Sequence, residues 1–257
     1  MITDSARGAG RASSEARAAL RELGLIGLAA VVYVAVRAIT EGRIELAVAN
    51  GRRILRLEGA LHLAWEQALQ GPLLGHPVLL KLANDVYIFG FWPVLAGAAV
   101  YLYVRHREHY VVLRNAVFIS GLIGFAFFAF LPVAPPRLVD PHLVDTIRLY
   151  TPDYRPVPLS DVTNEYASLP SLHFGWSLLV GLMVATASRR WIGYAFAVLM
   201  PTAMALAVLV TANHYVIDVI VGGVVALTAL ALARRLAARP AVERRRLALG
   251  RTGHERR

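Results

Sequence analysis

The sequence predicts an all-α fold, a polytopic membrane protein built as a six-transmembrane-helix bundle with an interfacial amphipathic helix. Hydrophobic residues make up 57% of the chain and the mean hydropathy is +0.52, values too high for an ordinary water-soluble domain. Several runs without charged residues approach the ~20 residues that a membrane-spanning helix needs. Basic residues gather at the ends of these runs and in the C-terminal tail, where membrane topology and anionic lipid place them. The net charge of +10 therefore indicates contact with the lipid bilayer and not with nucleic acid.

The chain divides into three predicted segments. Residues 1–22 are small, polar and charged and lack the apolar core and cleavage site of a secretory signal, so we expect a cytoplasmic N-terminal segment. Residues 23–235 form the predicted six-span membrane domain, and 236–257 form a basic cytoplasmic tail. The chain contains no cysteine, which excludes disulfide frameworks, thiolate metal sites and cysteine nucleophiles.

The first predicted span runs from Leu23 to Thr40, with Arg37 near enough to its end to reach the membrane surface. Residues 41–75 mix apolar and charged side chains too closely for a membrane span. This pattern is typical of an amphipathic helix at the interface, and it fits a solvated helical linker nearly as well.

Two uncharged runs follow, Val86–Val104 and Asn115–Pro136, and predict the second and third spans. Lys81 and Asp85 precede the second span at the four-residue spacing of a helical ion pair. Prolines end the third span. Residues 137–170 combine prolines and charges without a run long enough to cross, so we expect an ordered loop on one side of the membrane.

The last three predicted spans cover residues 172–188, 191–212 and 214–235. If the N-terminus lies inside, the inner segments carry 18 Lys and Arg residues and the outer segments carry 7. Because positively charged residues favour the cytoplasmic side, both termini are expected in the cytoplasm.

One pair of residues stands out at the start of the sixth predicted span. His214 and Asp218 are four residues apart, which places them one turn apart on the same helix face. An aspartate that accepts a hydrogen bond from one imidazole nitrogen leaves the other free to attack or to accept a proton. His173 begins the fourth span, and a second imidazole can protonate a leaving group. Counting the crossings places both histidines, and Arg137 in the preceding loop, on the outer face.

Two imidazoles, a carboxylate and a guanidinium on one face suit phosphate chemistry. Arg137 offers bidentate hydrogen bonds to phosphoryl oxygens. Ser171 and the backbone N–H groups at the start of the fourth helix add donors for an anion. Because charge stabilisation dominates phosphoryl transfer, this set predicts displacement at phosphorus by histidine.

Other interpretations of the same residues stay open. His214 and Asp218 can form a satisfied polar pair at a helix start, and Arg137 can be an interfacial anchor. Two histidines and a carboxylate also suit a metal site. A buried histidine and aspartate can relay protons in a proton-coupled transporter.

The motifs resemble those of a known family. Ser171-Leu-His173 and His214-x-x-x-Asp218, each at the start of a span, resemble the type 2 phosphatidic acid phosphatase superfamily. The surrounding residues are most similar to the branch that contains fungal inositol phosphorylceramide synthase, and the resemblance covers roughly residues 75–235. Leu172 stands where the phosphatases commonly have glycine, and Ala207-Val208 where they have Ser-Arg, which favours the phosphotransferase-like branch.

The resemblance implies a membrane enzyme that acts on lipid phosphate esters without a metal or cofactor. His214 would become phosphorylated, Asp218 would orient it and His173 would protonate the leaving group. Pro135-Pro-Arg137 would take the position of the family's first basic motif. Water or an alcohol acceptor would then attack the phosphohistidine, so phosphatase and phosphotransferase activity both stay open. The site would face the outside of the cell membrane.

Overall fold

A computed structural model describes residues 20–254 apart from 23, 26, 39, 41 and 152–163, with side chains described as far as 238. The predicted all-α fold is confirmed over these ranges, where the one exception is an isolated β-bridge between Val133 and Ala167. Most of the predicted N-terminal segment, the middle of the predicted loop and the end of the basic tail lie outside the described residues.

The helices follow one another along the chain in two groups. Residues 27–38 are helical and precede the elements named here. The first group is α2 (Ile44–Leu61), α3 (Glu66–Gln70), the 3₁₀ turn η1 (Gly71–Leu73), α4 (Pro77–Asp85), the π-helical turn η2 (Val86–Gly90) and α5 (Phe91–Arg105). The second group is α6 (Arg107–Phe130), α7 (Pro136–Val139), α8 (Thr146–Tyr150), α9 (Leu172–Ser188), α10 (Trp191–Val210) and α11 (Val216–His254).

Among the residues that the structure describes, four helical stretches are long and apolar enough to cross a membrane, which indicates a membrane-embedded protein. They are Pro77–Arg105, Arg107–Phe130, Trp191–Val210 and Val216–Ala238, and they overlap the second, third, fifth and sixth predicted spans. Helix α9 is apolar but shorter than these four. Because α9 is short and the predicted first span is described only in part, six spans stay a prediction.

The second span begins at Pro77, earlier than the predicted start at Val86. Proline is favoured at the first position of a helix, and α4 then continues through η2 into α5. Lys81 Nζ lies 2.8 Å from Asp85 Oδ2, so the predicted ion pair on α4 is confirmed. The predicted start was too late because Lys81 and Asp85, in the first turns of this helix, interrupt the uncharged run.

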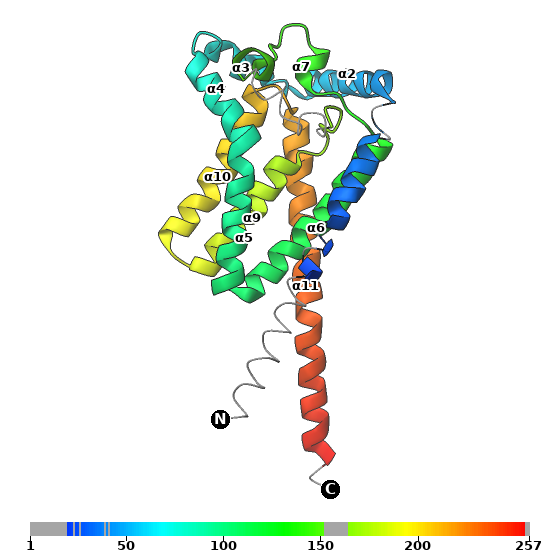
Figure 1. Cartoon of the computed structure of the whole chain (residues 1–257), viewed down its shortest axis with the longest axis vertical. Helices are drawn as coiled ribbons and strands as arrows, with labels where there is room; N and C mark the ends of the chain where they lie inside the picture. Colours follow the sequence, from blue (N-terminus) through cyan, green and yellow to red (C-terminus); the bar gives the residue numbers. More distant parts are fainter. Residues whose placement is uncertain are drawn as a thin grey trace.

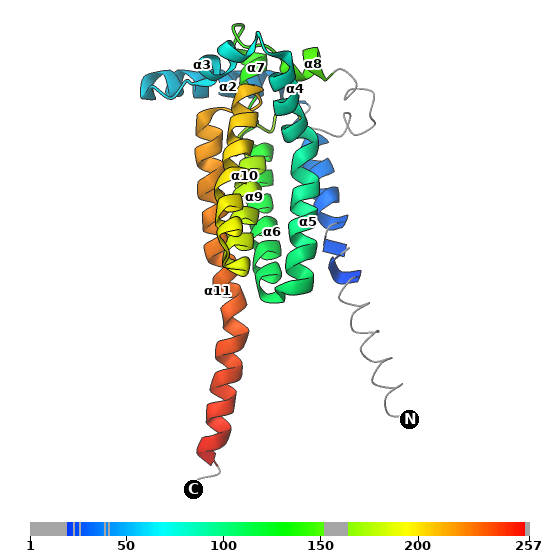
Figure 2. The same cartoon turned by 90° about the vertical axis from the view of Figure 1, so that its left-hand side faces the viewer.

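Helices α2 and α3 lie crosswise over one end of the bundle, whereas α11 extends past the bundle at the other end (Figures 1 and 2). The buried residues of α2 are Ala47, Asn50, Gly51 and Glu58, whose spacing marks one face of a helix. Helix α2 is therefore amphipathic, and its position at a membrane interface stays a prediction.

Two loop segments pair below α2 and fix the backbone around Ser168. Val133 N–H donates to the carbonyl of Tyr166 at 2.9 Å, and Ser168 N–H donates to the carbonyl of Val133 at 3.2 Å. The Asn50 side chain of α2 donates to the Pro132 carbonyl at 2.9 Å. The segment before α9 is thus tied both to the end of α6 and to α2.

Helices α9 and α11 cross in close contact because glycines stand at the crossing. A Cβ atom added to Gly222 would lie 2.3 Å from the Ser171 carbonyl oxygen. A Cβ atom added to Gly175 would lie 2.8 Å from the Gly222 carbonyl oxygen. Only glycine lets the two backbones approach this far, and the crossing brings the starts of both helices together.

We expect Gly222→Ala to destabilise the protein by about 1–3 kcal/mol, since the added methyl group would push α11 away from the backbone of Ser171. Gly97→Ala is the matched control, because nothing lies within 4 Å of a Cβ atom added there. Thermal unfolding of the purified proteins in detergent measures the difference. A Gly222→Ala protein that unfolds at the parental temperature would contradict the close crossing.

Candidate active site

A tight turn between α10 and α11 presents His214. Ala212 has φ = 51°, the left-handed conformation that residues other than glycine rarely adopt. The Asn213 side-chain amide donates to Thr211 Oγ1 at 2.7 Å, and the Asn213 backbone N–H donates to the Val208 carbonyl at 3.0 Å. The local strain at Ala212 is thus held in place by hydrogen bonds immediately before His214.

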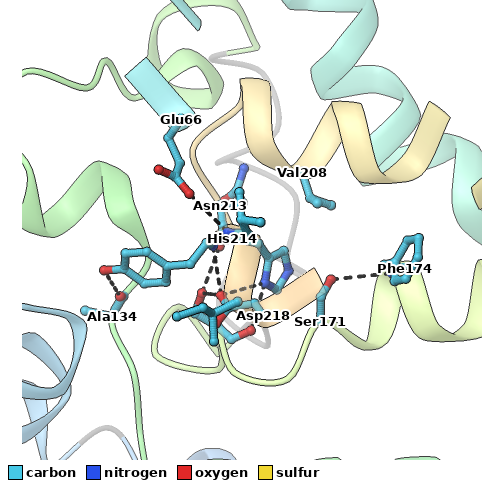
Figure 3. A network of polar contacts seen from close by, with 12 residues as sticks. Glu66, Ala134, Ser171, Phe174, Val208, Asn213, His214 and Asp218 are labelled. Atoms are coloured by element: carbon cyan, nitrogen blue, oxygen red, sulfur yellow. Dashed lines mark hydrogen bonds and ion pairs between the residues drawn. The ribbon is translucent and has the colours of Figure 1, made fainter. Parts of the chain in front are cut away.

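The hydrogen bonds of His214 determine which ring nitrogen carries the proton. Nδ1 lies 2.8 Å from the Ser168 carbonyl oxygen and 3.3 Å from Asp218 Oδ2 (Figure 3). A carbonyl oxygen only accepts hydrogen bonds, so Nδ1 must be the donor. The neutral ring therefore keeps an unprotonated Nε2, the nitrogen that can act as a nucleophile or base.

Asp218 is fully buried, and its side chain accepts hydrogen bonds from the segment before α9 and from the start of α11. Its Oδ2 accepts hydrogen bonds from the Ser168 hydroxyl group and from the Tyr215 backbone N–H, the latter at 3.0 Å. Its own backbone carbonyl accepts from the Ser171 N–H at 3.0 Å. Asp218 thereby links the start of α11 to the segment that precedes α9.

His173, in the first turn of α9, lies next to His214. The two ring centroids are 6.3 Å apart, so the two imidazoles are close neighbours although they are 41 residues apart in the chain. The ring of Tyr87 lies 4.6 Å from that of His173 and 6.4 Å from that of His214. Tyr87 belongs to the π-helical turn η2, and such turns are frequent at functional sites.

The two predicted phosphate-binding residues, Ser171 and Arg137, make different contacts near the two histidines. The Ser171 hydroxyl oxygen accepts from the Phe174 N–H at 3.4 Å and caps α9 (Figure 3). The backbone N–H of Arg137 donates to the Ala212 carbonyl at 3.1 Å, directly before the histidine turn. Its buried guanidinium lies 3.6 Å from carboxylate oxygens of Asp145 and Glu165. Among the described residues, the guanidinium of Arg137 pairs with these two carboxylates and not with either imidazole.

Comparison with known proteins decides the family. The model of the PAP2 superfamily matches residues 52–232, more than half of the chain. The chain belongs to the PAP2 superfamily. Membership indicates phosphatase or phosphotransferase activity on phosphate esters. No curated protein and no solved structure matches the chain.

The PAP2 match gives no support for the inositol phosphorylceramide synthase-like branch in particular, which stays a prediction. The match begins inside α2, ahead of the roughly 75–235 expected from the motifs. In the part of the chain that the structure describes, no group of three or more His, Cys, Asp or Glu side chains is arranged to hold a metal ion. The metal-site alternative therefore finds no support there.

Sequence reasoning missed two acids of this PAP2 chain that contact the start of α11. Glu66 Oε1 accepts a hydrogen bond from the Val216 N–H at 3.0 Å (Figure 3), and Glu58 Oε1 accepts from the Ile217 N–H at 2.7 Å. Both side chains are buried, whereas the sequence of residues 41–75 predicts an amphipathic helix at the interface or a solvated helical linker. The available signal was spacing, since Glu58 lies on the same helix face as Ala47 and Gly51.

The two acids hold their protons more tightly than usual. The pKa of Glu58 is raised to about 8, chiefly by burial and also by the negative charges of Glu66 and Asp218, while the hydrogen bond from Ile217 lowers it. Burial also raises the pKa of Glu66, partly offset by the hydrogen bond from Val216. Glu58 is therefore mainly neutral at pH 7.

This shift makes the stability of the PAP2 fold depend on pH. The folded state binds the Glu58 proton more tightly than the unfolded state, so this contribution is complete below about pH 4.5 and is lost as the pH rises through about 8. Glu66, whose pKa is shifted in the same direction, adds to the effect. We expect the apparent melting temperature to fall between pH 5 and 9, and to fall less in Glu58→Gln. The control is Glu45→Gln, at an exposed site on α2; equal slopes in all three proteins would refute the assignment.

Proposed function

We propose that this protein is an integral membrane lipid-phosphate phosphotransferase or phosphatase that acts through a phosphohistidine intermediate. The observation that carries the proposal is the position of His214. Its Nδ1–H donates to the Ser168 carbonyl at 2.8 Å, which leaves Nε2 with a free lone pair. The ring centroid of a second imidazole, that of His173, lies 6.3 Å from the ring centroid of His214. These are the parts required for nucleophilic attack with general acid assistance.

In the first step, Nε2 of His214 attacks phosphorus, and the P–N bond forms as the bond from phosphorus to the leaving oxygen breaks. His173, protonated once the anionic phosphoryl group is bound beside it, donates its proton to that oxygen and becomes neutral. In the second step, neutral His173 takes a proton from water or an alcohol, whose oxygen attacks phosphorus. The P–N bond then breaks, and the proton balance of both imidazoles is restored.

The surrounding charges favour these steps. The ring of His214 becomes cationic when the P–N bond forms, and the Asp218 carboxylate at 3.3 Å stabilises that charge. Helix α9 begins directly after Ser171, and the backbone N–H groups of its first turn provide positive partial charge for the anionic phosphoryl group. Arg137, proposed to bind phosphate, is held beside the turn by its backbone N–H on the Ala212 carbonyl. Its guanidinium would exchange Asp145 and Glu165 for the phosphoryl oxygens.

The substrate is proposed to be a membrane lipid phosphate reached at the extracytoplasmic face. The described residues include four apolar helices of spanning length, which suit a substrate carried in the bilayer. His173 lies in the first turn of α9 and His214 in the turn just before α11, at one end of the bundle. The excess of Lys and Arg counted in the predicted inner segments supports cytoplasmic termini and a multi-pass cell-membrane protein. No cofactor is needed for the steps above, and the acceptor is water or an alcohol.

We expect His214→Ala to lower lipid phosphate turnover by about a thousandfold or more, because the variant has no nucleophile. Purified protein in lipid–detergent micelles is assayed with a labelled lipid phosphate. His106→Ala, in the turn between α5 and α6 at the far end of the bundle, is the control and should keep parental turnover. Parental turnover by His214→Ala would remove the proposed function.

The same assay separates the two reaction outcomes. Label recovered as inorganic phosphate identifies water as the acceptor, and label recovered on a second lipid or on an added alcohol identifies a transferase.

A further inference from the structure

The first turn of α11 is capped by side chains from a distant part of the chain. Tyr215, directly before the helix, has no side-chain oxygen that folds back onto the first N–H groups, since its hydroxyl group donates to the Ala134 carbonyl at 3.0 Å. Glu66 and Glu58 instead accept the N–H groups of Val216 and Ile217. The free N–H groups of a helix start normally need such partners.

The two acids complete a set of three carboxyl groups that bind consecutive backbone N–H groups. Asp218 accepts from the N–H of Tyr215, Glu66 from Val216 and Glu58 from Ile217. The residue that precedes this series is His214. A shift of the first turn of α11 would therefore move the imidazole and the carboxylate that touches it together.

We propose that Glu58 and Glu66 are positioning residues of the active site, which hold the first turn of α11 so that His214 presents Nε2 to the phosphorus. The proposal rests on the proposed function, because it assigns these residues a part in the same reaction. It also gives α2 and α3 a role in catalysis that needs no contact with the substrate.

The chemistry of the buried acids indicates how they act. A helix N-terminus attracts negative charge, but Asp218 already supplies a carboxylate there, and two further buried charges would repel it. Burial and the negative charges of Glu66 and Asp218 raise the pKa of Glu58 to about 8, so that its carboxyl group is mainly protonated at pH 7. What Glu58 contributes is therefore a carbonyl-type acceptor at a fixed reach, and not a charge.

Reach and charge are separated by three substitutions at each acid. Gln keeps the length and the acceptor oxygen but cannot ionise, Asp keeps the carboxyl group but is one methylene shorter, and Met keeps the approximate volume without an oxygen acceptor. We expect Glu58→Gln and Glu66→Gln to retain kcat within about threefold. We expect the Asp and Met variants to lose kcat by about tenfold to a hundredfold, with KM nearly unchanged, since small displacements of a reacting group reduce the rate this strongly.

The rates are measured per folded molecule on a labelled lipid phosphate, with folded protein quantified by size-exclusion chromatography in detergent. The control set is Gln, Asp and Met at Glu45, an exposed acid on α2, where all three should keep the parental kcat. If the Met variants do not fold, the comparison of Gln with Asp decides alone. Parental kcat in the Asp variants, or an equal loss in Gln and Asp, would overturn the proposal.

Failure of the proposed function gives a different result. If the parent and the Glu45 variants show no lipid phosphate turnover, or if His214→Ala matches the parent, the reaction itself is wrong. If the parent is active and depends on His214 while Glu58 and Glu66 tolerate Asp, the reaction stands and the positioning role fails.

Discussion

Across the crossing of α9 and α11, the Ser171 backbone N–H donates to the Asp218 backbone carbonyl at 3.0 Å. This bond requires the two backbones to lie so close that a side chain at position 222 would overlap the Ser171 carbonyl. The two histidines are close neighbours only because their helices start on either side of this contact. The glycines at positions 175 and 222 therefore allow the close crossing on which the proximity of the two imidazoles depends.

Around that contact, hydrogen bonds to the backbone set the direction in which His214 points. The Ser168 carbonyl receives the Nδ1 proton, and the Ser168 hydroxyl group binds Asp218. Ser168 is itself fixed because its N–H pairs with Val133 below α2. The imidazole thus depends on loop segments that come from three separate parts of the chain. A preorganised arrangement of this kind lowers the reorganisation required when charge develops in a reaction.

The sequence was sufficient for the helical fold and for the proximity of His173, His214 and Asp218. Uncharged runs indicated where helices of spanning length lie, and the four-residue spacing placed His214 beside Asp218. Each run began with its histidine, so the parity of the crossings put His173 and His214 at one end. The boundaries were less accurate where charged residues occur inside a helix, as they do in α4.

The remaining features have weak signatures in sequence. Any residue can supply a backbone carbonyl, so nothing identified Ser168 as the nearest partner of His214. Glu58 and Glu66 stood among many charges in a segment that reads as exposed, and their partners are backbone N–H groups about 150 residues further along the chain. Arg137 was predicted to bind phosphate, and the structure places its guanidinium beside Asp145 and Glu165, a pairing that spacing alone does not reveal.

The central claim is that phosphorus becomes bonded to His214, and chemical trapping tests it most directly. Parent protein mixed with a lipid phosphate labelled on phosphorus is quenched in alkaline detergent within one turnover, and the labelled peptide is mapped. The account predicts a label that is stable to alkali, released by acid and located on residue 214. Turnover without any covalent label, or a label on His173 instead, would contradict it.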